Sequence, residues 1–150
     1  MILISHRGNI DGVYPDFENN PIYVNKALKN GFDVEIDVWC IDNRWYLGHD
    51  SPEHEITIRY LKDDRFWCHA KNIDALHGML KEGDIHCFWH QEDDVTLTSK
   101  GYMWTYPGKP LTDNSICVKP KKNDKIMKKT FGICSDFIVY YNNTGENSNE

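Results

Sequence analysis

Residues 34–39 of the chain read VEIDVW, a stretch in which apolar and acidic side chains alternate. This alternation is typical of a β-strand, because successive side chains of a strand point to opposite faces. Glu35 and Asp37 would therefore share one face, and the apolar residues 34, 36 and 38 would pack against helices on the other. The stretch predicts a strand that points two carboxylates into the interior of the protein.

Two buried carboxylates repel each other, and each loses its hydration on burial. A divalent cation between them would neutralise both, and their hard oxygen atoms suit Mg²⁺, Mn²⁺ or Ca²⁺. In the alternative interpretation, residues 34–39 form an edge strand and both carboxylates face solvent. The strand pattern alone does not separate the two.

Around this strand, the first ninety residues alternate between strand and helix patterns. Asn20 and Asn72 are suited to cap two helices, which Gly31 and Gly83 would end. Residues 56–62 form a short helical candidate. The predicted strands of this half are 2–5, 32–41, 45–48, 66–70 and 85–90. Beyond residue 90 the sequence predicts strands at 95–98, 102–106, 115–119 and 132–138, with a possible helix at 123–130.

Alternating strands and helices indicate an α/β fold with a largely parallel sheet. Eight strand candidates and a hairpin suggest a reduced (β/α)8 TIM-like barrel, although such barrels usually need about 200–250 residues. At 150 residues, several outer helices of the C-terminal half would be missing. We expect one domain over residues 1–141 and a polar, disordered tail over 142–150. A homodimer could cover the bare side.

Composition limits the partners and the compartment. The net charge of −6 gives no basic surface for nucleic acid. No apolar run approaches the ~18 residues of a membrane span. The five cysteines are widely spaced and form no metal-binding or redox pair, which indicates free thiols in a reducing, cytoplasmic setting. The expected partner is a small molecule.

Ionisable side chains recur toward the C-terminal ends of the first four strands. His69 and Lys71 share a face with Trp67, and His90 shares a face with His86. Enzymes built on barrels place their sites at this end of the strands. A lone histidine in a strand is usually a hydrogen-bonded core residue, so it is the coincidence across four strands that favours a functional site.

An ordered set of short motifs resembles the N-terminal half of the glycerophosphodiester phosphodiesterase family. The motifs are ISHRG at 4–8, EN at 18–19, AL at 27–28 before GF at 31–32, EIDV at 35–38, and LGHD at 47–50. FWCHAK at 66–71, WT at 104–105 and GICSD at 132–136 resemble later strands of the family more loosely.

The resemblance implies a TIM barrel that hydrolyses glycerophosphodiesters with one bound divalent metal ion. A neighbouring hydroxyl of the substrate can attack first in this family, which gives a cyclic phosphate that water then opens. The roles implied by matching positions are general base and acid for His6 and His49, metal ligation for Glu35 and Asp37, phosphate binding for Arg7 and Lys71, and support for Glu18 and Asp50.

The chain departs from the family at His69, where the family carries a glutamate as its third metal ligand. An imidazole can still coordinate, but it shifts the preference toward Mn²⁺ or Zn²⁺, and His90 could add a further ligand. Trp104 would form either a substrate wall or core packing. Glu18 could instead be a helix-start acid favoured by the helix dipole.

We therefore expect metal-dependent hydrolysis of a phosphodiester, with a glycerophosphodiester as the substrate suggested by the resemblance. One alternative is a catalytically inactive barrel that binds phosphate esters. Another is a metal-dependent amide or ester hydrolase, which would want an H-x-H pair on the first strand, where this chain has HRG at 6–8.

Overall fold

The structure is a computed structural model that describes residues 1–122 and 130–146. Its helices are α1 (Pro21–Lys29), α2 (Ile73–Glu82) and α3 (Ile138–Glu146), with a 3₁₀ turn at Ile58–Lys62. Its strands are β1 (Ile2–His6), β2 (Asp33–Ile41), β3 (Arg44–Leu47), β4 (His54–Ile56), β5 (Phe66–Ala70), β6 (Cys87–Phe88), β7 (Val95–Leu97), β8 (Met103–Thr105), β9 (Ser115–Val118) and β10 (Gly132–Ser135).

Local sequence explains where the first two helices begin and end. The Asn20 side chain accepts a hydrogen bond from the Ile22 backbone amide at 2.9 Å, and the Asn72 side chain accepts one from the Ala75 amide at 3.1 Å. Each bond satisfies a backbone donor that the first helical turn leaves free. Gly83 ends α2 with a φ of 78°, which glycine adopts without strain. The two predicted caps are confirmed.

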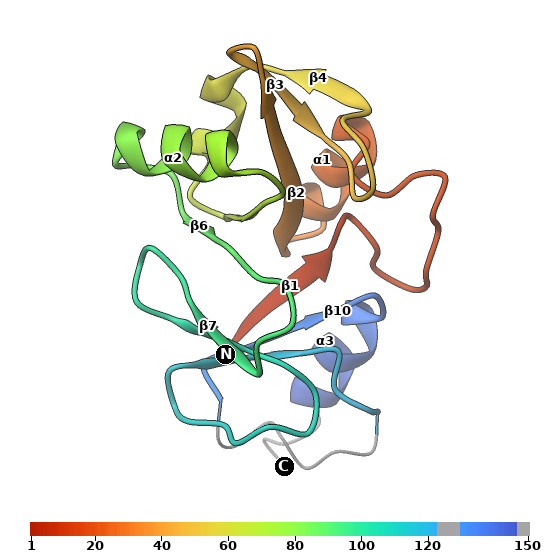
Figure 1. The fold of residues 1–150 in the computed structure, drawn as a ribbon. Helices are drawn as coiled ribbons and strands as arrows, with labels where there is room; N and C mark the ends of the chain where they lie inside the picture. Colours follow the sequence, from red (N-terminus) through yellow and green to blue (C-terminus); the bar gives the residue numbers. More distant parts are fainter. Residues whose placement is uncertain (123–129, 147–150) are drawn as a thin grey trace.

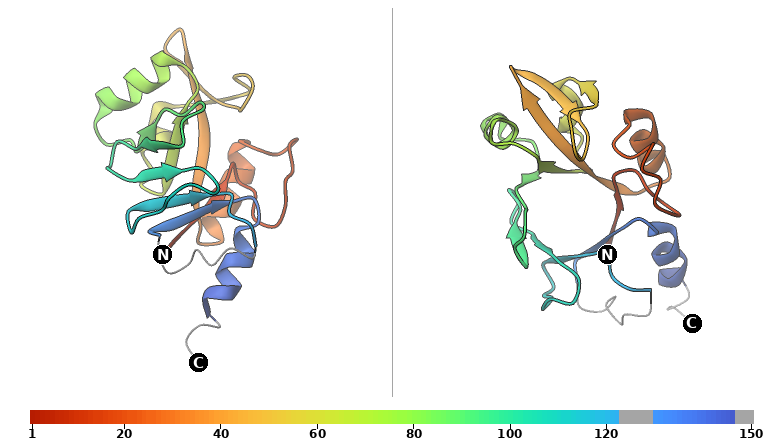
Figure 2. Two further views of the ribbon diagram at one scale, coloured as in Figure 1. Left: turned by 60° about the horizontal axis from the view of Figure 1, so that its bottom comes forward. Right: turned by 45° about the vertical axis from the view of Figure 1, so that its right-hand side comes forward.

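The ten strands form one mixed sheet that curls around its own interior (Figures 1 and 2). Parallel ladders join β6, β5, β2, β1, β10, β9 and β8 in that order. The antiparallel hairpin β3–β4 extends from β2, and β7 pairs antiparallel with β8. The first and last strands of the sequence, β1 and β10, are therefore neighbours near the middle of the sheet.

The expected (β/α)8 TIM-like barrel is wrong. The sheet is a curled half-barrel, and three helices are found in the part of the chain that the structure describes. Strands β3, β4 and β7 run antiparallel, and the described residues between β6 and β10 hold no α-helix. No ladder within the described residues joins β6 to β7, although the Ser99 amide donates to the Cys87 carbonyl across this opening. A full barrel of this class usually needs about 200–250 residues, and this sequence has 150.

Two layers of side chains stabilise the sheet. Outside the curl, α1 and α2 bury Val24, Ala27, Ala75 and Met79 against the apolar face of β2, which was predicted to pack on helices. Inside the curl, buried aliphatic and aromatic side chains form a second cluster. The inner cluster consists of Ile4, Trp67, Phe88, Trp104, Ile116, Val118 and Cys134.

The last helix carries the chain past the expected domain end. Helix α3 spans residues 138–146, whereas the sequence placed a strand up to 138 and a tail from 142. Residues 147–150 of that tail, and nearly all of the helix expected over 123–130, lie outside the described residues. Ser115 on β9 and Thr105 on β8 are buried within the same chain. The expected homodimer stays a prediction.

His86 should make the stability of the fold pH-dependent. It lies in the inner core beside Trp67, at 4.3 Å between ring centroids, and contacts the Thr98 hydroxyl at 2.8 Å. Burial, aided by the Lys100 charge, lowers the pKa of His86 from 6.5 to about 4. Between pH 6.5 and 4 the unfolded chain therefore binds a proton that the folded chain does not.

The expected result is that the contribution of His86 to the free energy of unfolding falls by up to about 3 kcal/mol as the pH drops from 6.5 to 4, and changes little below pH 4. Chemical unfolding of the wild type and of His86→Gln at several pH values measures the difference, because glutamine keeps a polar contact without titrating. A difference that is constant across this pH range would contradict the prediction.

Candidate metal centre and phosphate pocket

Three potential metal ligands lie close together on the inner face of the curled sheet. Glu35 and Asp37 project inward from β2, and His69 comes from the neighbouring strand β5, in register with Asp37. The His69 Nδ1 atom lies 3.2 Å from Asp37 Oδ1 and 3.7 Å from Glu35 Oε1. One ligand atom from each residue falls within 4.8 Å of the others. Asp37 is fully buried and Glu35 nearly so, which excludes the edge-strand alternative.

Two carboxylate oxygen atoms of this group lack hydrogen bonds. Glu35 Oε2 and Asp37 Oδ1 are buried and accept none within the described structure, although charged groups lie within 4 Å. Buried acceptors are normally satisfied, because leaving one unpaired costs on the order of 1–3 kcal/mol. A divalent cation would supply what these oxygen atoms lack. The residues present therefore fit a metal ion.

The orientation of His69 also fits metal ligation. Its Nε2 atom donates a hydrogen bond to the His90 backbone carbonyl at 2.9 Å, and its ring stacks on Phe88. The other nitrogen, Nδ1, must then face the two carboxylates. Burial alone would lower the pKa of His69, but Asp37 and Glu35 outweigh it and raise the pKa to about 9. A proton on Nδ1 and a metal ion are thus alternative counter-charges for the same acids.

Asp37 is held by a polar shell. The Asn19 side chain donates to Asp37 Oδ2 at 2.9 Å and accepts from the Asp37 backbone amide at 2.9 Å. Arg7 Nε lies 3.0 Å from the same oxygen. Burial would raise the pKa of Asp37, but His69, Arg7 and Asn19 together hold it well below its usual range. The carboxylate is therefore ionised and fixed in direction at neutral pH.

His6 forms a pair with Asp136, a residue to which the sequence analysis gave no role. His6 Nδ1 lies 2.6 Å from Asp136 Oδ1, and Asn9 donates to the same oxygen at 2.9 Å. Burial opposes ionisation of Asp136, but its contact with His6 dominates and lowers the pKa of the carboxyl to about 2. The ionised carboxylate accepts from Nδ1–H, which leaves His6 Nε2 on the side of Glu35, 3.8 Å from Oε2.

His49 stands at the rim of the site on the loop after β3. Its Nδ1 atom lies 2.7 Å from Asp50 Oδ1, so Nε2 is again the nitrogen without this partner. Gly48 places the loop: its φ is 155°, and a Cβ there would lie 1.9 Å from the Ser51 carbonyl oxygen. Only glycine fits this close approach. Asp50 itself is exposed and contacts the site through His49.

A pocket of about 400 Å³ opens above the cluster of Glu35, Asp37 and His69. Its walls hold most of the side chains predicted for the site, and they add an aromatic face formed by Trp104 and Tyr106. Lys71 Nζ lies 3.7 Å from Asp37 Oδ1. The predicted site residues that line this pocket are His6, Arg7, Glu35, His49, His69, Lys71, His90 and Trp104. Histidines, cations and an acidic centre thus share one cavity.

Three residues predicted to support the site make further contacts of their own. Glu18 accepts hydrogen bonds from Arg7 at 3.1 Å and from Asn9 at 2.8 Å, so it supports the arginine rather than starting a helix. His90 donates from Nε2 to the Asp93 carbonyl at 2.6 Å, and its side chain is outside the group of close ligand atoms. Trp104 both packs on Phe88 and lines the pocket.

Sequence reasoning assigned no role to several residues that complete the site: Asn9, Asn19, Tyr106, Lys119 and Asp136. Arg7, Asn19 and Lys119 have positive φ values of 57°, 61° and 46°. Residues other than glycine rarely adopt this backbone conformation, and strained residues of this kind concentrate at functional sites. A periodicity analysis cannot detect them, because each lies in a turn or loop beyond a regular element.

Comparison with known proteins gave no match among protein-family models, curated proteins or solved structures. None of the helices in the described residues has the length and apolar character needed to cross a membrane.

Proposed function

We propose that the protein is a metal-dependent phosphodiester hydrolase. The observation that carries the proposal is the cluster of Glu35, Asp37 and His69, with two unsatisfied carboxylate oxygen atoms, at the base of a pocket lined by Arg7 and Lys71. A phosphodiester is anionic, so nucleophilic attack on it requires neutralisation of its charge. The pocket offers both a cation site and fixed positive side chains for this purpose.

Glu35, Asp37 and His69 would hold one divalent ion, which neutralises phosphate charge and activates an oxygen nucleophile when bound. Mg²⁺, Ca²⁺ and Mn²⁺ suit the two carboxylates, and the imidazole nitrogen makes Zn²⁺ a further option. Arg7 is oriented by Glu18 and by Asp37, and Lys71 by Asp37. Both cations can therefore bind phosphate oxygen atoms without large rearrangement.

His6 and His49 would transfer the protons. Each has Nδ1 bound to a carboxylate, of Asp136 and Asp50 respectively, and each lines the pocket. In this tautomer Nε2 is the nitrogen available for chemistry, as in other carboxylate–histidine pairs. His6 would enter neutral and take the proton from the attacking hydroxyl on Nε2, whereas His49 would enter as the imidazolium and give its Nε2 proton to the leaving alcohol oxygen.

The resemblance of residues 4–50 to the glycerophosphodiester phosphodiesterases favours a glycerophosphodiester as the substrate. Its free hydroxyl next to the ester can act as the nucleophile. All five cysteines are buried and none is in a disulfide, which suits a reducing, cytoplasmic compartment.

A second candidate function is a catalytically inactive domain that binds phosphate esters. The specific observation in its favour is His69, because its imidazolium already provides a counter-charge for Glu35 and Asp37. In that case the phosphate would bind to Arg7 and Lys71 without turnover.

The deciding experiment measures hydrolysis of glycerophosphoethanolamine and of bis-nitrophenyl phosphate. The protein is first treated with chelator and then supplied with Mg²⁺, Ca²⁺, Mn²⁺ or Zn²⁺ in turn. The proposal expects turnover that disappears with chelator and returns with at least one ion. Inactivity with all four ions, together with measurable phosphate binding, would favour the inactive domain.

Replacing His69 by glutamate should make the protein more dependent on metal. The variant places a third carboxylate beside Glu35 and Asp37 and removes the imidazolium, so the metal-free fold should lose about 3 kcal/mol of unfolding free energy. With Mg²⁺ or Ca²⁺ its activity should equal or exceed that of the wild type. Thermal unfolding and hydrolysis are measured with chelator and with each ion.

His69→Gln is the matched control for this substitution, because it removes the imidazole without adding charge. Loss of activity in both variants, at saturating metal, would show that the imidazole has a role that a carboxylate cannot fill.

A further inference from the structure

A second pocket of about 320 Å³ adjoins the first, and the two share three lining residues. These residues are Arg7, His49 and Lys119, all with basic side chains. On one side of them the first pocket leads to the candidate metal ligands. On the other side the second pocket is bounded by the loop between β1 and α1, including Val13 and Pro15. Four carboxylates, of Glu18, Asp50, Glu53 and Asp136, line the rest of this pocket, so its wall away from the junction is acidic. The two pockets therefore meet at a basic junction.

The backbone at Lys119 is unusual. Its φ is 46°, although it is neither glycine nor asparagine and it precedes Pro120, a position that favours extended backbone. Two contacts hold this turn: the Lys119 amide donates to the Cys134 carbonyl at 2.8 Å, and the Tyr141 hydroxyl donates to the Pro120 carbonyl at 2.9 Å. Strand β10 and helix α3 thus fix a strained residue at the junction.

The side chain of Lys119 is the more accessible of the two permanent cations there. Its Nζ lies 3.5 Å from Asp136 Oδ2 and the side chain is 48% exposed. The Arg7 side chain is 17% exposed and contacts Asp37 at 3.0 Å and Glu18 at 3.1 Å. Asp136 uses its other oxygen for His6, so Lys119 stands next to the proposed base. An accessible ammonium in this position can bind a phosphate oxygen.

We propose that Lys119 binds the phosphate of a two-armed diester at this junction, together with Arg7 and His49, and that the second pocket holds one of the two ester arms. The inference rests on the proposed function and names its substrate class. A diester carries two alcohol groups on one anionic centre, which matches two pockets that meet at basic side chains. A phosphate monoester or a small cyclic phosphate would leave the second pocket empty.

The first test compares Lys119→Ala with Lys121→Ala, an exposed lysine of the same segment that lines neither pocket. Calorimetry measures binding of inorganic phosphate, and kinetics measure KM for glycerophosphoethanolamine. Loss of one charge-assisted contact should weaken phosphate binding and raise KM, each by about 10-fold. Lys119→Arg should restore most of both, and Lys121→Ala should match the wild type.

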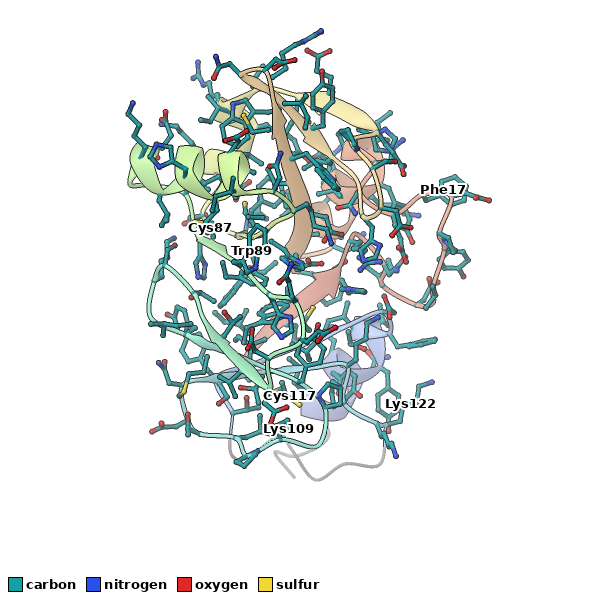
Figure 3. The ribbon with its side chains drawn as sticks, in the orientation of Figure 1. Phe17, Cys87, Trp89, Lys109, Cys117 and Lys122 are labelled. Carbon is teal, nitrogen blue, oxygen red and sulfur yellow. The ribbon has the colours of Figure 1, made fainter. Side chains whose placement is uncertain are left out.

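The second test fills the neighbouring pocket. Val13 is 52% exposed on the loop, so Val13→Trp should fold normally while it occupies this pocket. KM for the diester should rise about 10-fold, and binding of inorganic phosphate, which has no ester arm, should stay unchanged. Phe17→Trp is the control, because Phe17 lies on the same loop, is 56% exposed and lines neither pocket (Figure 3).

The outcomes separate this inference from the proposed function. If the wild type is active and Lys119→Ala binds phosphate and diester normally, Lys119 has no such role and the inference is overturned. If Val13→Trp leaves KM unchanged, the assignment of the second pocket is overturned. If the wild type hydrolyses no diester but its phosphate binding depends on Lys119, the hydrolase fails while the phosphate site at the junction stands.

Discussion

Replacing Glu35 with glutamine should lower metal-dependent phosphodiester turnover by at least ~100-fold, the scale of one metal or electrostatic contribution. Glutamine keeps the size of the side chain and removes the charge that a divalent ion needs. Glu35 Oε2 is one of the two buried oxygen atoms without a hydrogen bond, so a metal ligand is lost while no hydrogen bond to that atom is broken. The fold should therefore survive the change.

The measurement combines hydrolysis of glycerophosphoethanolamine with calorimetric titration of Mn²⁺ into the chelator-treated protein. Glu55→Gln is the matched control, because Glu55 is an exposed residue of β4 that pairs with Arg44 on the surface. The control should keep both turnover and metal affinity. A Glu35→Gln variant with normal turnover would mean that the metal site is misplaced.

Replacing His6 with alanine should also lower turnover by at least ~100-fold, because general acid–base groups contribute about 10²–10⁴-fold. The Asp136 carboxylate holds Nδ1 and so directs Nε2 toward the metal cluster. Alanine removes the proton acceptor but none of the three candidate ligands. Metal affinity should therefore change much less than turnover.

Added imidazole provides a second measurement, since the buried space left by the ring can admit it and restore part of the activity. His77→Ala, on the outer face of α2, is the control and should behave as the wild type. An equal loss of metal binding and turnover in His6→Ala would indicate a structural role instead of proton transfer.

The elements that local patterns specify were predictable from the sequence. Asn20, Asn72 and Gly83 set helix ends through their own hydrogen bonds or backbone conformations, which do not depend on the rest of the fold. The alternation in residues 34–38 predicted that Glu35 and Asp37 share one face of the strand, because successive side chains point to opposite faces, but it left open whether that face is interior or solvent-exposed. The strands at 66–70 and 115–118 follow for the same reason.

The global architecture was not predictable in this way. A run of short strands is compatible with a closed barrel or an open curled sheet, and the choice depends on which edges pair across the molecule. Strand β7 pairs antiparallel with β8, and β6 keeps an edge without a ladder in the described residues. Hydrophobic periodicity predicts neither of these pairings. Two signals spoke against a full barrel, namely the chain length and the scarcity of helix patterns beyond residue 90.

The residues of the candidate site likewise fall into two groups, those that strand periodicity predicted and those that it did not. Glu35, Asp37 and His69 lie on regular strands, so strand parity predicted which of their neighbours share a face with them, and the burial of the two acids then identified that face as the inner one. Asp136 and Lys119 follow the ends of β10 and β9, where the backbone leaves the sheet and parity no longer applies. Their positions depend on tertiary contacts, such as the Tyr141 hydroxyl that holds Pro120. Only the structure could assign them.

The pairing of β1 with β10 has a consequence for how the protein folds. The bond between His6 and Asp136 joins residues 130 positions apart, and the strands that carry them are adjacent. Until residues 132–135 have been synthesised, β1 keeps an unpaired edge and the proposed base lacks its partner. Closing so long a loop is entropically costly and slows refolding. We expect the site to be assembled in the last kinetic phase, after the β2–β5 region has formed.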